Sequence, residues 1–65
     1  MKLRVNGDDL ETVAPTVRDL LHQLGFAGKP TVVELNQRAL FPREHEATPL
    51  SDGDIVEIVQ ITAGG

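Results

Sequence analysis

Residues 62–65 are the part of the chain whose composition could do chemistry. They end in Gly64 and Gly65, and no charged or bulky side chain follows Ile61. Because glycine has no Cβ atom, such a tail is thin enough to pass through a narrow channel into the active site of another protein. We therefore predict a flexible tail over residues 62–65, with Gly65 as the reactive residue and with Ala63 and Gly64 threaded into a partner.

The chemistry open to this tail is that of an activated carboxylate. A free carboxylate repels nucleophiles, but transfer of AMP from ATP would turn it into an acyl-adenylate with a good leaving group. Sulfur could then displace AMP and give a C-terminal thiocarboxylate, whose sulfur can attack an electrophilic carbon in a later reaction. In this scheme the carboxylate of Gly65 is consumed and regenerated, so the chain is a carrier and not an enzyme.

Other candidate sites are better explained as ordinary structure. Residues 52–54 hold two carboxylates, but an oxygen-ligand metal cage needs more donors, and a turn accounts for this segment. His45 stands between two glutamates and could be a general base, yet no nucleophile is near it, so we expect a solvated loop histidine. We predict no catalytic residue, no metal site and no stably bound cofactor, since no set of acid, base and nucleophile can be assembled.

Composition restricts the class of protein and its partners. A chain of 65 residues that is 40% hydrophobic and 25% charged is expected to form one folded domain over residues 1–65. Its formal net charge of -4 and its scattered lysines and arginines argue against nucleic acid as a partner. No apolar run approaches the roughly 20 residues of a membrane span, so we expect no membrane contact and a cytoplasmic location.

Hydrophobic periodicity predicts the elements that must position the tail. Apolar and polar residues alternate in the strand segments, and Asn6 with Gly7 is typical of a tight hairpin turn. Thr16 can cap a helix whose apolar residues recur at helical spacing until Gly25 ends it. Strands are expected at residues 2–5, 10–13, 31–35, 38–41 and 55–61. Since one helix covers one face of a sheet, the predicted fold class is α+β, with a mixed sheet of four or five strands.

The last predicted strand, residues 55–61, leads into the tail and is apolar on both faces. Val56 and Ile58 fall on one face, whereas Ile55 and Val59 fall on the other, where no second helix is available to cover them. An exposed aliphatic patch at Ile55 and Val59 would suit a docking partner.

Residues 43–49 show no periodicity, and we expect them to form a loop. Arg43 at its start could hold an acidic surface of a partner. An ion pair within the loop is an equally good explanation for this arginine.

Three motifs in order together resemble one known family. They are Val-Glu-Leu-Asn-Gln at 33–37 with Pro-Arg-Glu at 42–44, then Leu-Ser-Asp-Gly-Asp-Ile-Val-Glu-Ile at 50–58, then Ala-Gly-Gly at 63–65. In this order and spacing they resemble the ThiS family of thiamin-biosynthesis sulfur carriers, which has the β-grasp (ubiquitin-like) fold, over nearly the whole chain. The sequence departs from the family at His45, which stands near a position where relatives often carry a large aromatic residue.

The resemblance implies a pathway and a set of partners. An E1-like enzyme would adenylate the tail with ATP, a cysteine desulfurase or another donor would supply sulfur, and thiazole synthase would take it for the thiazole ring of thiamin. Gly64 and Gly65 match the reactive tail of the family. Three alternatives remain open: the small subunit of molybdopterin synthase, a ubiquitin-like modifier that forms isopeptide bonds through Gly65, and an interaction domain with an inert tail.

Overall fold

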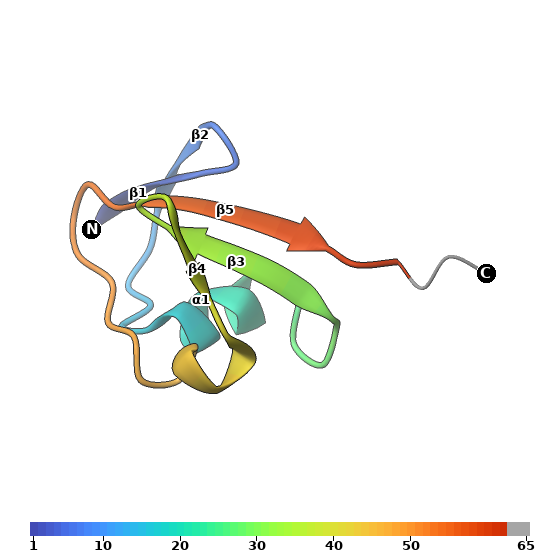
Figure 1. Ribbon diagram of the computed structural model, residues 1–65. Helices are drawn as coiled ribbons and strands as arrows, with labels where there is room; N and C mark the ends of the chain where they lie inside the picture. Colours follow the sequence, from blue (N-terminus) through green and yellow to red (C-terminus); the bar gives the residue numbers. More distant parts are fainter. Residues whose placement is uncertain (63–65) are drawn as a thin grey trace.

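The last strand of the chain occupies the centre of the sheet. The computed structural model describes residues 1–62, and in it five strands form one sheet in the order β2-β1-β5-β3-β4, with a single α-helix against one face (Figure 1). The elements are β1 (Lys2–Val5), β2 (Asp8–Glu11), α1 (Val17–Gln23), β3 (Thr31–Leu35), β4 (Arg38–Leu40), the short 3-10 helix η1 (Pro42–Glu44) and β5 (Ile55–Gln60). β5 runs parallel to β1 and antiparallel to β3. The predicted α+β class with a mixed sheet is confirmed.

Two tight turns connect the outer strand pairs. Asn6 and Gly7, with φ of 49° and 86°, join β1 to β2, and Asn36 and Gln37, with φ of 51° and 70°, join β3 to β4. Positive φ at both central residues is the geometry that matches the twist of paired strands. Because the first turn has only these residues, pairing resumes at once, and the predicted start of β2 at residue 10 was wrong: the strand covers Asp8–Glu11.

The helix begins and ends where the sequence predicts. Thr16 caps its first turn, with its Oγ1 accepting from the Asp19 amide at 3.3 Å. At the other end Gly25 has a φ of 86°, and its amide donates to the His22 carbonyl, while the Phe26 amide donates to the Leu21 carbonyl. This pair of bonds is a Schellman motif, which only a residue with positive φ can close without strain.

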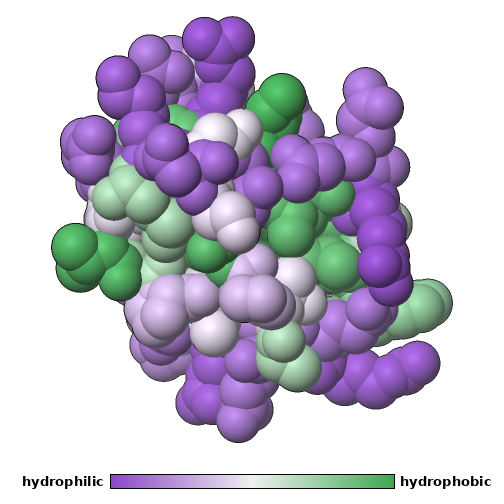
Figure 2. Space-filling view, turned by 90° about the vertical axis from the view of Figure 1, so that its left-hand side faces the viewer, coloured by the Kyte–Doolittle hydropathy of each residue, from purple (hydrophilic) through white to green (hydrophobic). Residues whose placement is uncertain are grey.

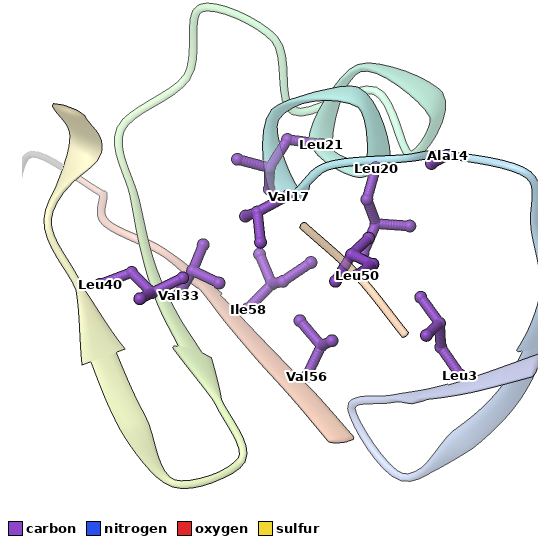
Figure 3. Close-up of a cluster of buried hydrophobic side chains, with 10 residues drawn as sticks. All are labelled: Leu3, Ala14, Val17, Leu20, Leu21, Val33, Leu40, Leu50, Val56 and Ile58. Carbon is purple, nitrogen blue, oxygen red and sulfur yellow. The ribbon is translucent and has the colours of Figure 1, made fainter. Parts of the chain in front are cut away.

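The core lies between α1 and the inner face of the sheet (Figure 3). Leu20 and Val17 from the helix are fully buried and extend toward the strands, which contribute Leu3, Val33 and Val56. The remaining core residues are Ala14, Leu21, Leu40, Leu50 and Ile58. Burial of these aliphatic side chains is the main stabilising term of a domain this small. Leu24 and Leu35 are only partly buried at its margin.

The segment from 43 to 49 is more ordered than its sequence predicts. It begins with η1, and its backbone then caps the helix: the Val17 amide donates to the Thr48 carbonyl and the Arg18 amide to the His45 carbonyl, both at 3.0 Å. These bonds satisfy amides that the first turn of a helix leaves unpaired. They also draw His45 inward until 8% of it is exposed. The expectation of a solvated loop histidine was therefore wrong, because contacts distant in sequence bury this residue.

Candidate functional site

The chain leaves the sheet from its central strand. β5 pairs with β3 from Thr31 opposite Gln60, and the Ile61 amide donates to the Pro30 carbonyl at 2.9 Å, one residue beyond the strand. The base of the predicted tail is thus attached to the body of the domain up to residue 61. Ala63, Gly64 and Gly65 lie outside the described residues, so their roles remain predictions.

Asparagine side chains from the two turns hold β5 in place. Asn6 Oδ1 accepts from the Ile58 amide at 2.7 Å, and Asn6 Nδ2 donates to the Ile58 carbonyl at 3.1 Å. Asn36 Oδ1 accepts from the Ile55 amide at 2.9 Å, and its Nδ2 donates to Asp54 Oδ1 at 3.0 Å. Asn6 was predicted only as a turn residue, and the bonds of Asn6 and Asn36 to β5 were not predicted. An asparagine at a turn where glycine would also fit was the available signal.

The face of the sheet opposite α1 has exposed apolar residues at both ends of β5. Ile55 is 48% and Val59 61% exposed, and Val59 lies opposite Val32, which is also exposed. Between them Glu57 lies opposite Glu34, and like charges in that arrangement repel. We call these five residues the open face. Both predicted docking residues on β5 therefore lie on the open face, although docking itself is not tested.

The end of the molecule opposite the C-terminal part of β5 has a more hydrophilic surface. Figure 2 shows that hydrophilic side chains cover most of this end and that hydrophobic ones form separate patches. No broad apolar surface is visible there. The open face is consequently the better candidate for an apolar interface.

Arg43, the third predicted docking residue, lies in a different place. Its guanidinium is 4.9 Å from the centroid of the Phe41 ring, within the range of a cation–π contact. It also lines a cleft of about 580 Å³ between α1, the loop before β3 and η1. The residues that line the cleft are Arg18, Leu21, His22, Phe26, Ala27, Gly28, Lys29, Pro30, Thr31, Pro42, Arg43, His45, Glu46 and Ile61. Arg43 therefore lies at the cleft and not on the open face with Ile55 and Val59.

His45 is a titratable residue in the wall of the cleft. Burial lowers the pKa of its imidazole below the usual 6.5, and the nearby Glu44 carboxylate and a hydrogen bond with the Leu40 backbone oppose this in part. Its Nε2 is buried and makes no hydrogen bond within the described part of the chain. An imidazole whose Nε2 is unsatisfied therefore lies in the wall of the cleft.

Residues 1–62 contain neither a cluster of metal ligands nor a membrane-spanning helix. No group of three or more His, Cys, Asp or Glu side chains there is arranged to hold a metal ion. No helix among these residues is both long and apolar enough to cross a membrane.

Comparisons with known proteins agree with one another. The model of the ThiS family matches residues 3–65. The sulfur carrier protein ThiS of Thermus thermophilus is 34% identical over 61 residues, which are 94% of this chain and 95% of that one. The crystal structure of a ThiS protein from Geobacter metallireducens superposes with a TM-score of 0.84 at 35% identity over the full length of both chains. The solution structure of a thiamine biosynthesis protein from the same organism has a TM-score of 0.80 and is covered to 88%.

Proposed function

The chain belongs to the ThiS family, with its β-grasp fold, and from this premise we propose that it carries sulfur as a thiocarboxylate on Gly65 for the thiazole ring of thiamin. It is a sulfur carrier of thiamin biosynthesis and acts as a co-substrate of other enzymes. The predicted cytoplasmic location is consistent with this assignment.

The proposed cycle has three steps. An E1-like enzyme transfers AMP from ATP to the carboxylate of Gly65 and releases pyrophosphate, which converts a poor electrophile into a good one. The outer sulfur of a donor persulfide, such as that of a cysteine desulfurase, displaces AMP and forms an acyl disulfide with Gly65. A thiol then attacks the S–S bond, which releases the thiocarboxylate and leaves a disulfide on the donor. Thiazole synthase then receives the sulfur and the carboxylate returns. ATP is a substrate of the partner enzyme in this cycle, and the carrier itself holds no cofactor.

The structural observation that supports this proposal is the position of β5. As the central strand it has a neighbour on each edge, and Asn6 and Asn36 add side-chain bonds to it. The polypeptide that precedes the tail is therefore rigid up to Ile61. A rigid base lets a partner that recognises the folded body also receive the end of the chain in a defined place.

Recognition of the folded body is proposed to occur through the open face. Ile55 and Val59 would bury aliphatic surface against the adenylating enzyme. A cation of the partner between Glu34 and Glu57 would relieve the repulsion of their carboxylates. Such an interface combines an apolar contact with a charge that sets its register.

The first experiment measures the mass of the C-terminal tryptic peptide, Glu44 to Gly65. The chain is incubated with an E1-like enzyme of thiamin biosynthesis, ATP and a sulfur donor. Replacement of one oxygen by sulfur, located at Gly65, is the expected result. The peptide contains no methionine, so oxidation of Met1, which has nearly the same nominal mass change, cannot imitate the product. A chain that lacks Gly65 serves as the control and should remain unmodified.

The outcome of this experiment separates the alternatives. An unmodified peptide, in a reaction that converts another ThiS protein, would refute the carrier assignment. A thiocarboxylate that thiazole synthase consumes supports the thiamin pathway, whereas consumption only by molybdopterin synthase would move the chain to that pathway. Covalent conjugates to lysines of other proteins on a denaturing gel would instead indicate a modifier.

A second experiment tests the open face. We expect Ile55→Ser combined with Val59→Ser to lower kcat/KM for adenylation by about thirtyfold, because truncated apolar contacts at an interface centre are worth on the order of 1 kcal/mol each. Val13→Ser is the matched control, since Val13 is 94% exposed and lies outside the sheet. Equal activity of the double variant and the control would exclude the open face as the docking surface.

A further inference from the structure

The cleft beside Ile61 is a second candidate for an interaction surface, distinct from the open face. We propose that it binds an acidic segment of a partner protein. The proposal does not depend on the chemistry of the tail, because it concerns recognition of the folded body alone. Charge, an unsatisfied buried imidazole nitrogen and the shape of the cleft each support it.

Charge is distributed unevenly over this molecule. The chain has a formal net charge of -4, with ten acidic residues against six Lys and Arg. Nevertheless the cleft is lined by three of these six, whereas Glu46 is its one acidic residue among the described residues. Glu46 is already paired with Arg18 at 3.2 Å. A concentration of positive charge on an acidic protein marks a place that attracts anionic groups.

Two of the cations remain available for a partner. Neither Lys29 nor Arg43 forms an ion pair within the part of the chain that the structure describes. They come from the two sides of the cleft, Lys29 from the loop before β3 and Arg43 from η1. A carboxylate in the cleft would find a donor on either side, and charge-assisted hydrogen bonds of this kind are the strong ones.

His45 supplies a second and independent indication. Its side chain is more than nine-tenths buried in the wall of the cleft, yet Nε2 has no hydrogen-bond partner in the structure. A buried polar nitrogen without a partner is unfavourable, so it is rare in folded proteins unless a ligand or water satisfies it. A carboxylate of a bound partner would favour the protonated imidazole, in which Nε2–H is a donor that can bond to a carboxylate oxygen.

The size and the lining of the cleft favour a peptide over a free anion. Its volume of about 580 Å³ is in the range of sites that hold several ligand groups. Apolar side chains, including Phe26, Pro30, Pro42 and Ile61, line it together with the cations. A phosphate ion could use only the charged part, whereas a segment with carboxylate and aliphatic side chains could use both. Because Ile61 borders the cleft, a partner bound there would lie next to the base of the tail.

The experiment titrates the full chain, labelled with ¹⁵N, with a short peptide of glutamates and interspersed leucines. The amide resonances expected to shift are those of the cleft, with Lys29, Arg43 and His45 among them. The double variant Lys29→Gln with Arg43→Gln should weaken binding by about tenfold, the loss expected for two exposed charge-assisted contacts. The control Lys2→Gln with Arg4→Gln removes the same charge from β1, outside the cleft, and should change the affinity less than about twofold.

Several results would overturn the proposal. The same affinity in the cleft variant and in the β1 control would show that net charge alone attracts the peptide. Shifts that map to β1 or to the open face would place binding elsewhere. Inorganic phosphate that shifts the cleft resonances and binds as tightly as the peptide would make the cleft a simple anion site. Equal binding of a peptide with glutamine in place of glutamate would remove charge as the basis of recognition.

Discussion

Replacement of Asn6 by glycine tests whether the turn asparagines hold the central strand. Asn6 has a φ of 49°, which glycine adopts without strain, so the substitution keeps the turn and removes only the side chain. The side chain accounts for two hydrogen bonds, one to the amide and one to the carbonyl of Ile58. β1 ends at Val5, so these bonds continue the pairing of β1 with β5 beyond the last strand residue.

The expected loss of stability follows from this geometry. Two hydrogen bonds at about 1 kcal/mol each give a loss of about 2 kcal/mol, since both groups of Ile58 are partly buried. A domain of this size has a net stability of roughly 3 to 5 kcal/mol, so the variant loses about half of it. At roughly 4–8 °C per kcal/mol, Tm should fall by roughly 8–16 °C. Asn6→Ala should lose about 1 kcal/mol more, because alanine is strained at positive φ.

Two measurements and a matched control decide the outcome. Urea denaturation followed by circular dichroism gives the free energy of unfolding, and hydrogen exchange of the Ile58 amide reports on its own bond. The control is Gln37→Gly, at a residue with a φ of 70° in the other hairpin, where glycine should stabilise by about 1 kcal/mol. A neutral or stabilising effect of Asn6→Gly, with unchanged exchange at Ile58, would refute the reasoning.

Two further predictions concern the core and the buried histidine. Leu20→Ala removes a fully buried side chain and should destabilise by about 2–5 kcal/mol, enough to leave much of the chain unfolded at 37 °C, as loss of dispersed amide resonances would show. Because burial lowers the pKa of His45 in the folded protein, the unfolded chain binds the proton more tightly than the folded chain does. The contribution of neutral His45 to stability is therefore present above pH 6.5 and is lost as the pH falls through the folded-state pKa. His45→Phe should therefore reduce the rise of the unfolding free energy with pH in this acidic range, measured by denaturation at a series of pH values. If the unfolding free energies of the parent and the variant changed equally with pH there, the lowered pKa would be contradicted.

The elements of this fold were predictable from the sequence because their signals are local. Strand alternation, the cap at Thr16 and the stop at Gly25 each depend on residues within one or two turns of chain. The start of β2 was predicted wrongly because aspartates such as Asp8 and Asp9 are typical of loops. Pairing with β1 nevertheless places both residues in the strand. Local propensity is weak where a neighbouring strand decides.

The features that were not predictable depend on contacts between distant segments. His45 is buried because its carbonyl and that of Thr48 cap the helix that begins at Val17, far earlier in the chain. The bonds of Asn6 to Ile58 likewise connect residues 52 positions apart. No local pattern encodes such pairings, so the cleft and the second role of the asparagines required the fold. For the candidate site, the sequence predicted the exposed face of β5 but not the cleft that Arg43 lines.

The placement of β5 between β1 and β3 also determines how the domain responds to force. A partner that holds the tail in a narrow channel and then moves pulls along the axis of β5. Hydrogen bonds to both neighbours lie across that axis, so they are loaded together in shear and cannot be opened one after another from the end. An edge strand in the same position would have only one such ladder. We therefore expect the carrier to withstand the proposed insertion and withdrawal of its tail without losing its last strand, even though its equilibrium stability is small.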